Sequence, residues 1–340
     1  IIFDFLDKDF LMTLKLTIPR AIGLAATQIN FIIIPAIGSL LVAGSITVFS
    51  LANDLSAPII GLIAIPFSTA VFPALSLAIS KGDKKDFLEK FNFTLRQILF
   101  LIIPISALSF MLRAHLVRVV FGAGMFDWTA TKLTAACFGI FMFCLFAQGL
   151  IFLFSKAFYA MKNTTIPALV SIISIAILPL LAYFFVHFIV RDNIISDFVS
   201  WGLKIDRVNN MAVIGLPLAI AIDVLLQITL LVILFKYKVK EFQLKPIIIF
   251  SLKVLVATVL TIIPTYLIRQ IFGGYFGSDT FMVLFFQTAI VGISGLLIYF
   301  FMAYLMKIEE VNHLKMYVIT HTGFLGNKNS KKAVIESLDK

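Results

Sequence analysis

Two carboxylates lie inside apolar stretches long enough to cross a membrane, and these residues are the best candidates for chemistry. Asp54 follows Asn53 in the run GSITVFSLANDLSAPIIGLIAIPFSTAVFPALSLAIS, which covers residues 44–80. Asp223 lies in GLPLAIAIDVLLQITLL, where Gln227 comes four residues later on the same helical face. A carboxylate at the bilayer centre costs about 2.5–3.5 kcal/mol, so it usually faces protein or water and marks a functional site.

Either carboxylate could bind a proton or a coupling cation in a transporter. Asp54 is expected about 12 Å along its helix, near the mid-depth of the membrane, where transporters place substrate sites. Pro58 and Pro66 leave backbone carbonyls without a donor and would let this span bend as a hinge. Two structural alternatives remain open. The span with Asp54 could be a kinked packing helix in which neighbouring helices cap the carboxylate, and Asp223 could serve only to join two helices by a hydrogen bond.

The composition indicates an integral membrane protein. The 340 residues are 61% hydrophobic and 14% charged, whereas soluble domains are about 45–50% apolar and about 25% charged. Apolar runs of about 20 residues predict helices rather than the strands of a barrel. The sequence has no phosphate loop, nucleophile elbow, nucleotide fingerprint or zinc-ligand spacing, so we expect neither an enzyme nor a cofactor, metal or nucleic-acid site. Cys137 and Cys144 are expected to pack as apolar residues.

We predict an all-α polytopic bundle of eight membrane-spanning helices, at residues 14–43, 46–79, 94–116, 134–160, 165–190, 212–236, 247–271 and 281–306. The first two could instead be three shorter spans with a break at NDLSAP. Most of the 28 Lys and Arg residues fall in segments that the eight-span arrangement places on one side. The positive-inside rule makes that side cytoplasmic and places both ends of the chain there.

The connections carry three further expectations. Residues 81–91, KGDKKDFLEKF, are expected to form a solvated cytoplasmic loop. Asp127 is expected to cap the following helix. Residues 187–211 have apolar positions at helical spacing among charges, which predicts an interfacial amphipathic helix on the outer surface. The chain begins IIFDFLDKDF rather than with Met, so we expect it to be the C-terminal part of a longer protein.

Six motifs occur in an order that resembles the C-terminal half of the MurJ/MviN lipid II flippases, members of the multidrug/oligosaccharidyl-lipid/polysaccharide exporter superfamily. They are PRAIGLAATQIN (19–30), GSITVFSLANDL (44–55), FPALS (72–76), FGAGMFD (121–127), AFYAMKNTTIP (157–167) and GLPLA (215–219). The resemblance implies a second six-helix lobe in residues 1–240, two extra helices beside a lipid-tail groove in 241–306, and a cytoplasmic tail in 307–340. A first lobe would be expected in cis.

The resemblance also implies an activity and partners. Such proteins move undecaprenyl-pyrophosphate-linked disaccharide-pentapeptide from the inner to the outer leaflet of the bacterial cytoplasmic membrane. They do so by alternating access, in contact with membrane lipids. Transport is driven by membrane potential or an unidentified coupling ion rather than by ATP. The alternatives are an exporter of another polyprenyl-linked glycan or an organic cation, and a non-transporting scaffold for cell-wall enzymes.

The substrate cavity is then expected to include Asn53, Asp54, Gln28 and Asn30. Where many members of the family carry a cavity arginine in the context A-x-R-L, this chain has Ala-Asn-Asp-Leu at residues 52–55. An arginine pairs with pyrophosphate, whereas Asp54 would repel it. Asp54 would therefore balance a cation from the other lobe or hold a coupling ion, and Arg20 could substitute as an anion contact.

Overall fold

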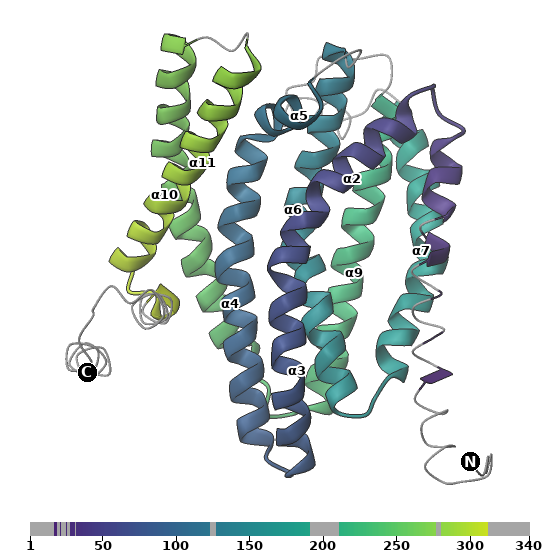
Figure 1. Ribbon diagram of the computed structural model, residues 1–340. Coiled ribbons are helices and arrows are strands. Elements are labelled where there is room, and N and C mark those ends of the chain that lie inside the picture. The colour runs from purple at the N-terminus through teal and green to yellow at the C-terminus, as the bar shows by residue number, and fades with distance from the viewer. Residues whose placement is uncertain are drawn as a thin grey trace, which may run out of the picture.

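The computed structural model describes residues 17–18, 21, 25, 28–30, 32–122, 127–190, 211–276 and 280–311. Every regular element in these residues is helical (Figure 1). The longer elements are α2 (Ser45–Leu62), α3 (Ala64–Ser80), α4 (Lys84–Met111), α5 (Arg113–Phe121), α6 (Trp128–Ala160), α7 (Thr165–Val190), the 3-10 helix η1 (Met211–Ile214), α9 (Gly215–Lys238), α10 (Leu244–Phe276) and α11 (Phe281–Leu305).

Seven helical stretches in this part of the chain are long and apolar enough to cross a membrane, with α2 and α3 counted as one. They correspond to the second to eighth predicted spans, so the predicted all-α membrane fold is confirmed. The alternative with a break at NDLSAP is wrong, because residues 45–80 form one kinked span. The first predicted span falls largely outside the described residues, which retain an apolar helical stretch at 28–38. The predicted amphipathic helix at residues 187–211 also lies outside them, apart from residues 187–190 and 211.

The predicted loop at residues 81–91 is wrong in most of its length, since α4 already begins at Lys84. The Asp83 side chain accepts a hydrogen bond from the Asp86 backbone N–H at 2.9 Å and caps the helix. Lys90 then pairs with Asp86 at 2.6 Å, one helical turn away. These charges sustain a solvated helical extension of the span instead of a loop. The predicted cap at Asp127 is confirmed, because its carboxylate accepts from Ala130 N–H at 2.6 Å.

The kink between α2 and α3 lies at Ile63, where the backbone has φ −114° and ψ −69°. Pro66 has no N–H to donate to the Leu62 carbonyl, and its ring crowds that carbonyl, so the helix breaks within the preceding turn. Pro58 likewise cannot donate to the carbonyl of Asp54. In Figure 1, α2 tilts away from the axis of α3, and both follow the surface of α6.

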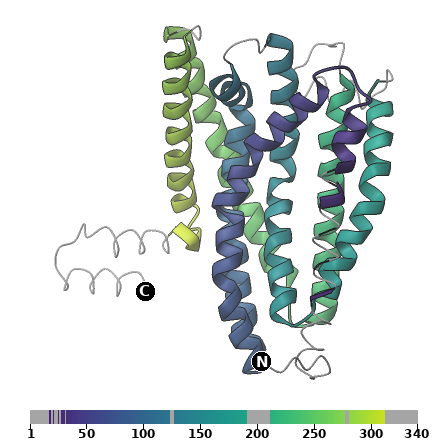
Figure 2. The same cartoon turned by 45° about the vertical axis from the view of Figure 1, so that its right-hand side comes forward.

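The core is organised around α6, which packs against α2, α3, α4 and α9. Its Cys137 and Cys144 are buried and free, as predicted. Six phenylalanine rings from four segments pack together in the core, and the shortest centroid separation among them is 4.7 Å, between Phe91 and Phe235. Helices α10 and α11 stand beside this bundle as a pair (Figure 2). Tyr299 of α11 anchors them by donating to the Phe100 carbonyl at 2.9 Å.

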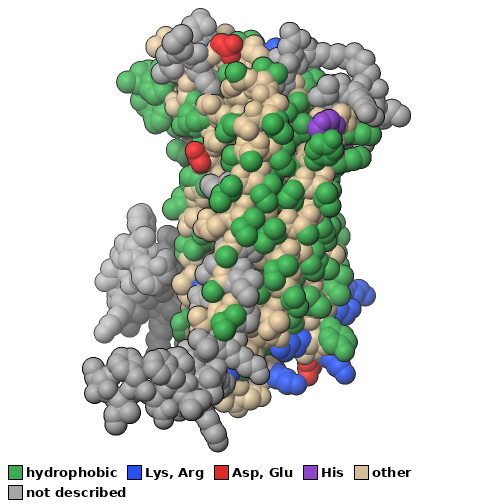
Figure 3. Space-filling model, turned by 90° about the vertical axis from the view of Figure 1, so that its right-hand side faces the viewer, with side chains coloured by type: hydrophobic (Ala, Val, Ile, Leu, Met, Phe, Trp, Pro, Cys, Tyr) green, Lys and Arg blue, Asp and Glu red, His purple; other side chains and the backbone are tan. Residues whose placement is uncertain are grey.

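Two helices end on lysines with a left-handed backbone conformation. Lys162 follows α6 with φ 56°, and Lys307 follows α11 with φ 51°. Both ends close by the same paired backbone bonds, such as Ile308 N–H to Ala303 O at 3.0 Å. A non-glycine residue there costs about 1–2 kcal/mol. The face in Figure 3 shows hydrophobic side chains over its middle and lysines and arginines gathered at its lower end.

Candidate functional site

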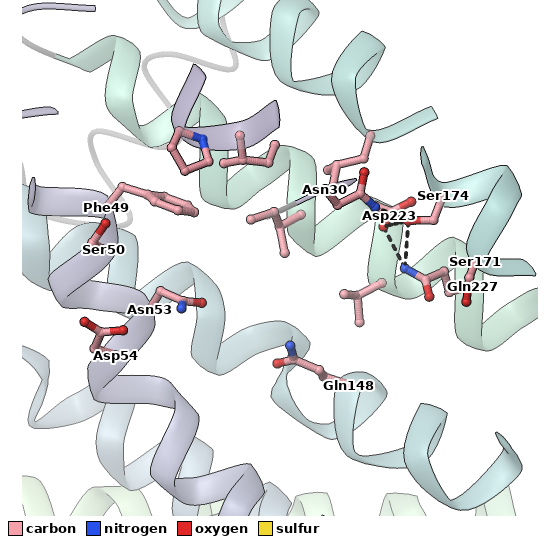
Figure 4. Close-up of a pocket in the computed structure, with 15 residues that line it drawn as sticks. Asn30, Phe49, Ser50, Asn53, Asp54, Gln148, Ser171, Ser174, Asp223 and Gln227 are labelled. Carbon is pink, nitrogen blue, oxygen red and sulfur yellow. Dashed lines mark hydrogen bonds between the residues drawn. The ribbon is translucent and has the colours of Figure 1, made fainter. Parts of the chain in front are cut away.

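A polar cavity of about 480 Å³ opens between α2, α6, α7 and α9 (Figure 4). Fifteen residues line it, and more than half of them are polar: Asn30, Ser50, Asn53, Asp54, Gln148, Ser171, Ser174, Asp223 and Gln227. The described lining includes two carboxylates and neither lysine nor arginine. The cavity is therefore rich in hydrogen-bond acceptors and negative in charge.

The α7–α9 wall is a closed hydrogen-bond network centred on Asp223, which is 3% exposed. Ser174 Oγ donates to Asp223 Oδ2 at 2.7 Å, and Gln227 Nε2 donates to the same oxygen at 2.7 Å. Asn30 Nδ2 donates in turn to Ser174 Oγ at 3.1 Å. Since Asp223 and Gln227 are one turn apart on α9, the predicted shared face is confirmed. The network supplies the donors that a buried carboxylate needs.

The α2 wall has a different character. The Asp54 side chain is exposed, and its carboxylate forms no hydrogen bond or ion pair with any residue that the structure describes. Asn53 is half-buried and points toward the cavity in Figure 4, where Asp54 and Asp223 lie on opposite walls. Because Pro58 cannot donate to it, the Asp54 backbone carbonyl is a second acceptor beside the carboxylate.

The structure brings together four of the residues that the sequence nominated: Asn30, Asn53, Asp54 and Asp223. Gln28 is exposed and does not line this cavity. Arg20 lies outside the described residues.

Sequence analysis missed four polar lining residues, namely Ser50, Gln148, Ser171 and Ser174. Their signal is weak but present. Ser171 and Ser174 are three residues apart in an otherwise apolar span, so they share a helical face. Small hydroxyl residues in spans also serve ordinary helix packing, so spacing alone does not single them out.

The arrangement can bind a proton, a cation or hydroxyl and amide donors. Asn30 Oδ1 is buried and accepts no hydrogen bond within the described part of the chain, which adds an unfilled acceptor next to Ser174. No group of three or more His, Cys, Asp or Glu side chains that could hold a metal ion occurs in the described part of the chain.

The chain also matches known proteins. The model of the family described as "Lipid II flippase MurJ" matches residues 1–287. The chain belongs to this family. The curated relatives include a probable lipid II flippase MurJ of Buchnera aphidicola subsp. Baizongia pistaciae, 26% identical over 186 residues, and one of Helicobacter pylori strain J99, 27% identical over 168 residues. These matches cover 55% and 49% of this chain but 36% of each relative.

The fold is similar to those of solved transporters. A structure of "Lipid II flippase MurJ, inward closed conformation" superimposes with a TM-score of 0.65 at 24% identity, covering 89% of this chain and 56% of that one. A MATE structure in complex with MaD3S superimposes with a TM-score of 0.55 at 14% identity, covering 96% of this chain and 77% of that one. Membership of the MurJ family and the seven apolar helices make this a multi-pass protein of the bacterial inner membrane.

Proposed function

We propose that this chain forms the cavity-bearing C-terminal lobe of a flippase that moves lipid II from the inner to the outer leaflet. The observation that carries the proposal is a polar cavity set among membrane-spanning helices of a MurJ-family chain. The chain spans about a third of the length of the curated relatives it matches, and the proposed activity would need more than this lobe alone. A first lobe in cis would complete the enclosure, and no catalytic step is required.

The lobe would comprise residues 1–240, the extra helix pair residues 241–306, and the tail residues 307–340. The lysine-rich end of the bundle would face the cytoplasm, with both chain ends on that side. The kink at Ile63 would let the α2 wall rock against α6 as the cavity changes its accessible side. Binding of a proton or cation at Asp54 or Asp223 would bias that change, because it removes a negative charge from a substrate path that must admit pyrophosphate.

The cavity's charge favours a second candidate, the export of an organic cation. Two carboxylates without a cation in the described lining would attract a cation and repel pyrophosphate. A lipid II flippase with this lobe needs arginines or lysines from the other lobe or from Arg20 to hold the substrate. In the first candidate the positive charges are basic side chains outside the described lining, whereas in the second the positive charge is on the substrate.

The test is complementation in bacteria depleted of their own flippase, using the gene product with any sequence that precedes Ile1. We expect restored growth and lipid II at the outer leaflet. Asp54→Ala should impair both while the protein stays inserted and abundant, and Glu241→Gln, a change outside the cavity, should not. Failure to expose lipid II at normal abundance, together with efflux of a cationic dye, would establish the second candidate instead.

A further inference from the structure

A second polar pocket, of about 370 Å³, lies away from the cavity, between the transport bundle and the extra helix pair. It is formed by α4, the first turns of α10 and the segment that follows α11. Its lining is Arg96, Gln243, Lys245, Pro246, Ile249, Phe250, Lys253, Lys307, Ile308, Glu309 and Glu310. None of these residues lines the cavity that contains Asp223.

The pocket carries an excess of positive charge. Both of its acids are within reach of Arg96, whose Nη1 lies 3.2 Å from Glu309 Oε2 and 3.9 Å from Glu310 Oε1. The Arg96 guanidinium also stacks over the Phe250 ring at 5.4 Å. The three lysines, Lys245, Lys253 and Lys307, form no ion pair within the described residues. They leave the pocket with donors for an anion.

The position of Lys253 narrows the choice of anion. It lies nine residues into α10, about 13 Å from the start of the helix, and it is exposed on a membrane-spanning helix. Ile249 and Leu252 beside it are 47% and 55% exposed. A lysine there must extend its ammonium along the helix toward the membrane surface. Its surroundings suit a ligand that has acyl chains as well as a negative charge.

Lys307 supplies an independent observation. Its left-handed backbone, with φ 51°, is a conformation that favours glycine. A lysine nevertheless occupies it, and its exposed side chain lines the pocket. Lys162, outside the pocket, has the same backbone conformation, so the reason to assign Lys307 a ligand role is the place of its side chain in the pocket lining.

We propose that this pocket binds the phosphate group of an anionic glycerophospholipid between α4 and α10. Lys245, Lys253 and Lys307 would donate to the phosphate oxygens, and the acyl chains would lie against the exposed apolar side chains of α10. Basic pockets between membrane helices at the cytoplasmic surface are suited to such headgroups. The site is separate from the cavity, so the proposal does not depend on which substrate is transported.

The test measures lipid binding rather than transport. The purified chain is titrated with phosphatidylglycerol in detergent and followed by native mass spectrometry, with phosphatidylcholine as the uncharged reference. Loss of each lysine should weaken phosphatidylglycerol binding about fivefold, and the variant K245Q/K253Q/K307G about 100-fold. Equal binding by the triple variant and the parent chain would overturn the proposal.

Two matched variants separate a ligand site from a structural role. Lys307→Gly removes the side chain and relieves the backbone, so it should keep or raise the melting temperature while phosphatidylglycerol affinity falls. Lys162→Gly makes the same change at the end of α6, outside the pocket, and should leave the affinity unchanged. An equal loss of affinity in Lys162→Gly would show nonspecific charge attraction and overturn the proposal.

The same chemistry could be met by a soluble anion, so inorganic phosphate and pyrophosphate form the other arms. We expect millimolar concentrations of either to displace little phosphatidylglycerol, because they lack acyl chains. Displacement at concentrations comparable to that of the lipid would assign the pocket to a soluble phosphate and overturn the lipid assignment.

Discussion

The two walls of the cavity present the same carboxylate in opposite settings. Asp223 on α9 is 3% exposed and accepts two hydrogen bonds at 2.7 Å. Asp54 on α2 is exposed and has no partner among the residues described. Both residues lie in apolar spans of similar character, and the difference comes from which neighbours the fold brings to each.

This contrast indicates that the two walls of the cavity contribute differently to stability and to transport. The α7–α9 wall holds its charge by donors from α7 and α9, and Asn30 supports the α7 donor, so changing the carboxylate disturbs packing as well as charge. The α2 wall carries a charge that contributes little to packing, on a helix that breaks at Ile63. We therefore expect stability and transport to respond together on the first wall and separately on the second.

The largest effect is expected for Asp223→Ala. It removes the acceptor of Ser174 and Gln227, and buried donors without an acceptor cost about 1–3 kcal/mol in total. Transport should be lost and the thermal midpoint in detergent should fall. Asp223→Asn is the matched control, because its amide oxygen can still accept both bonds while the charge is gone. A stable, fully active Asp223→Asn would show that this charge has no role in coupling.

Asp54→Ala is expected to separate the two properties. An exposed side chain without partners should change the unfolding free energy by no more than about 0.5 kcal/mol. Transport should fall about tenfold, which corresponds to about 1.4 kcal/mol in the barrier. Flipping rate and thermal midpoint measured on the same preparation check this. A loss of stability equal to that of Asp223→Ala would remove the contrast between the walls.

A smaller effect, a few-fold decrease in transport rate, is expected for Pro66→Ala. The new N–H can bond to the Leu62 carbonyl and straighten the break at Ile63. Distances between spin labels on α2 and α3 should lengthen. Pro264→Ala, in the middle of α10 and away from the cavity, serves as the control. Unchanged label distances in Pro66→Ala would assign the kink to packing against α6 instead of to the proline.

The last prediction concerns the pH dependence of stability. The contribution of His115 must be subtracted before the pH dependence of stability is attributed to either carboxylate. Burial, with Arg269 and Arg118 nearby, lowers the pKa of His115 on α5 from 6.5 to about 4. The unfolded chain therefore binds this proton below about pH 6.5, whereas the folded chain does not. Stability should fall by about 1 kcal/mol, allowing for partial exposure, as the pH drops from 6.5 toward 4. Thermal midpoints of His115→Gln should lack this component; an unchanged pH profile would contradict it.

Much of the fold could be predicted because membrane burial is recorded directly in hydropathy. The span at residues 165–190 has the bounds of α7, and the eighth span differs from α11 by one residue. The errors occur where charged residues continue a helix beyond the membrane. The sequence predicts a loop that includes residues 84–90, whereas a cap and an ion pair one turn apart make these residues helical.

The site was predicted less completely. Asp54, Asn53, Asn30 and Asp223 were identified because ionisable and amide groups are rare in apolar spans. Ser174 was not, because a serine in a span also serves ordinary helix packing. Gln148 carries the same amide signal as Asn30 and Asn53 and was overlooked. Only the packing of α7 against α9 shows that Ser174 binds Asp223.

The sequence by itself determined that the protein lies in a membrane, and it gave the number and placement of most described spans. It also determined the side on which the lysines gather and the polar residues whose burial in the membrane is unfavourable. These follow from local transfer free energies, which each segment carries alone. Tertiary structure decided which carboxylate is held by donors, which is left open, where α2–α3 breaks and which lysines share a pocket with Arg96. Those properties depend on contacts between segments far apart in the chain, and no single segment contains them.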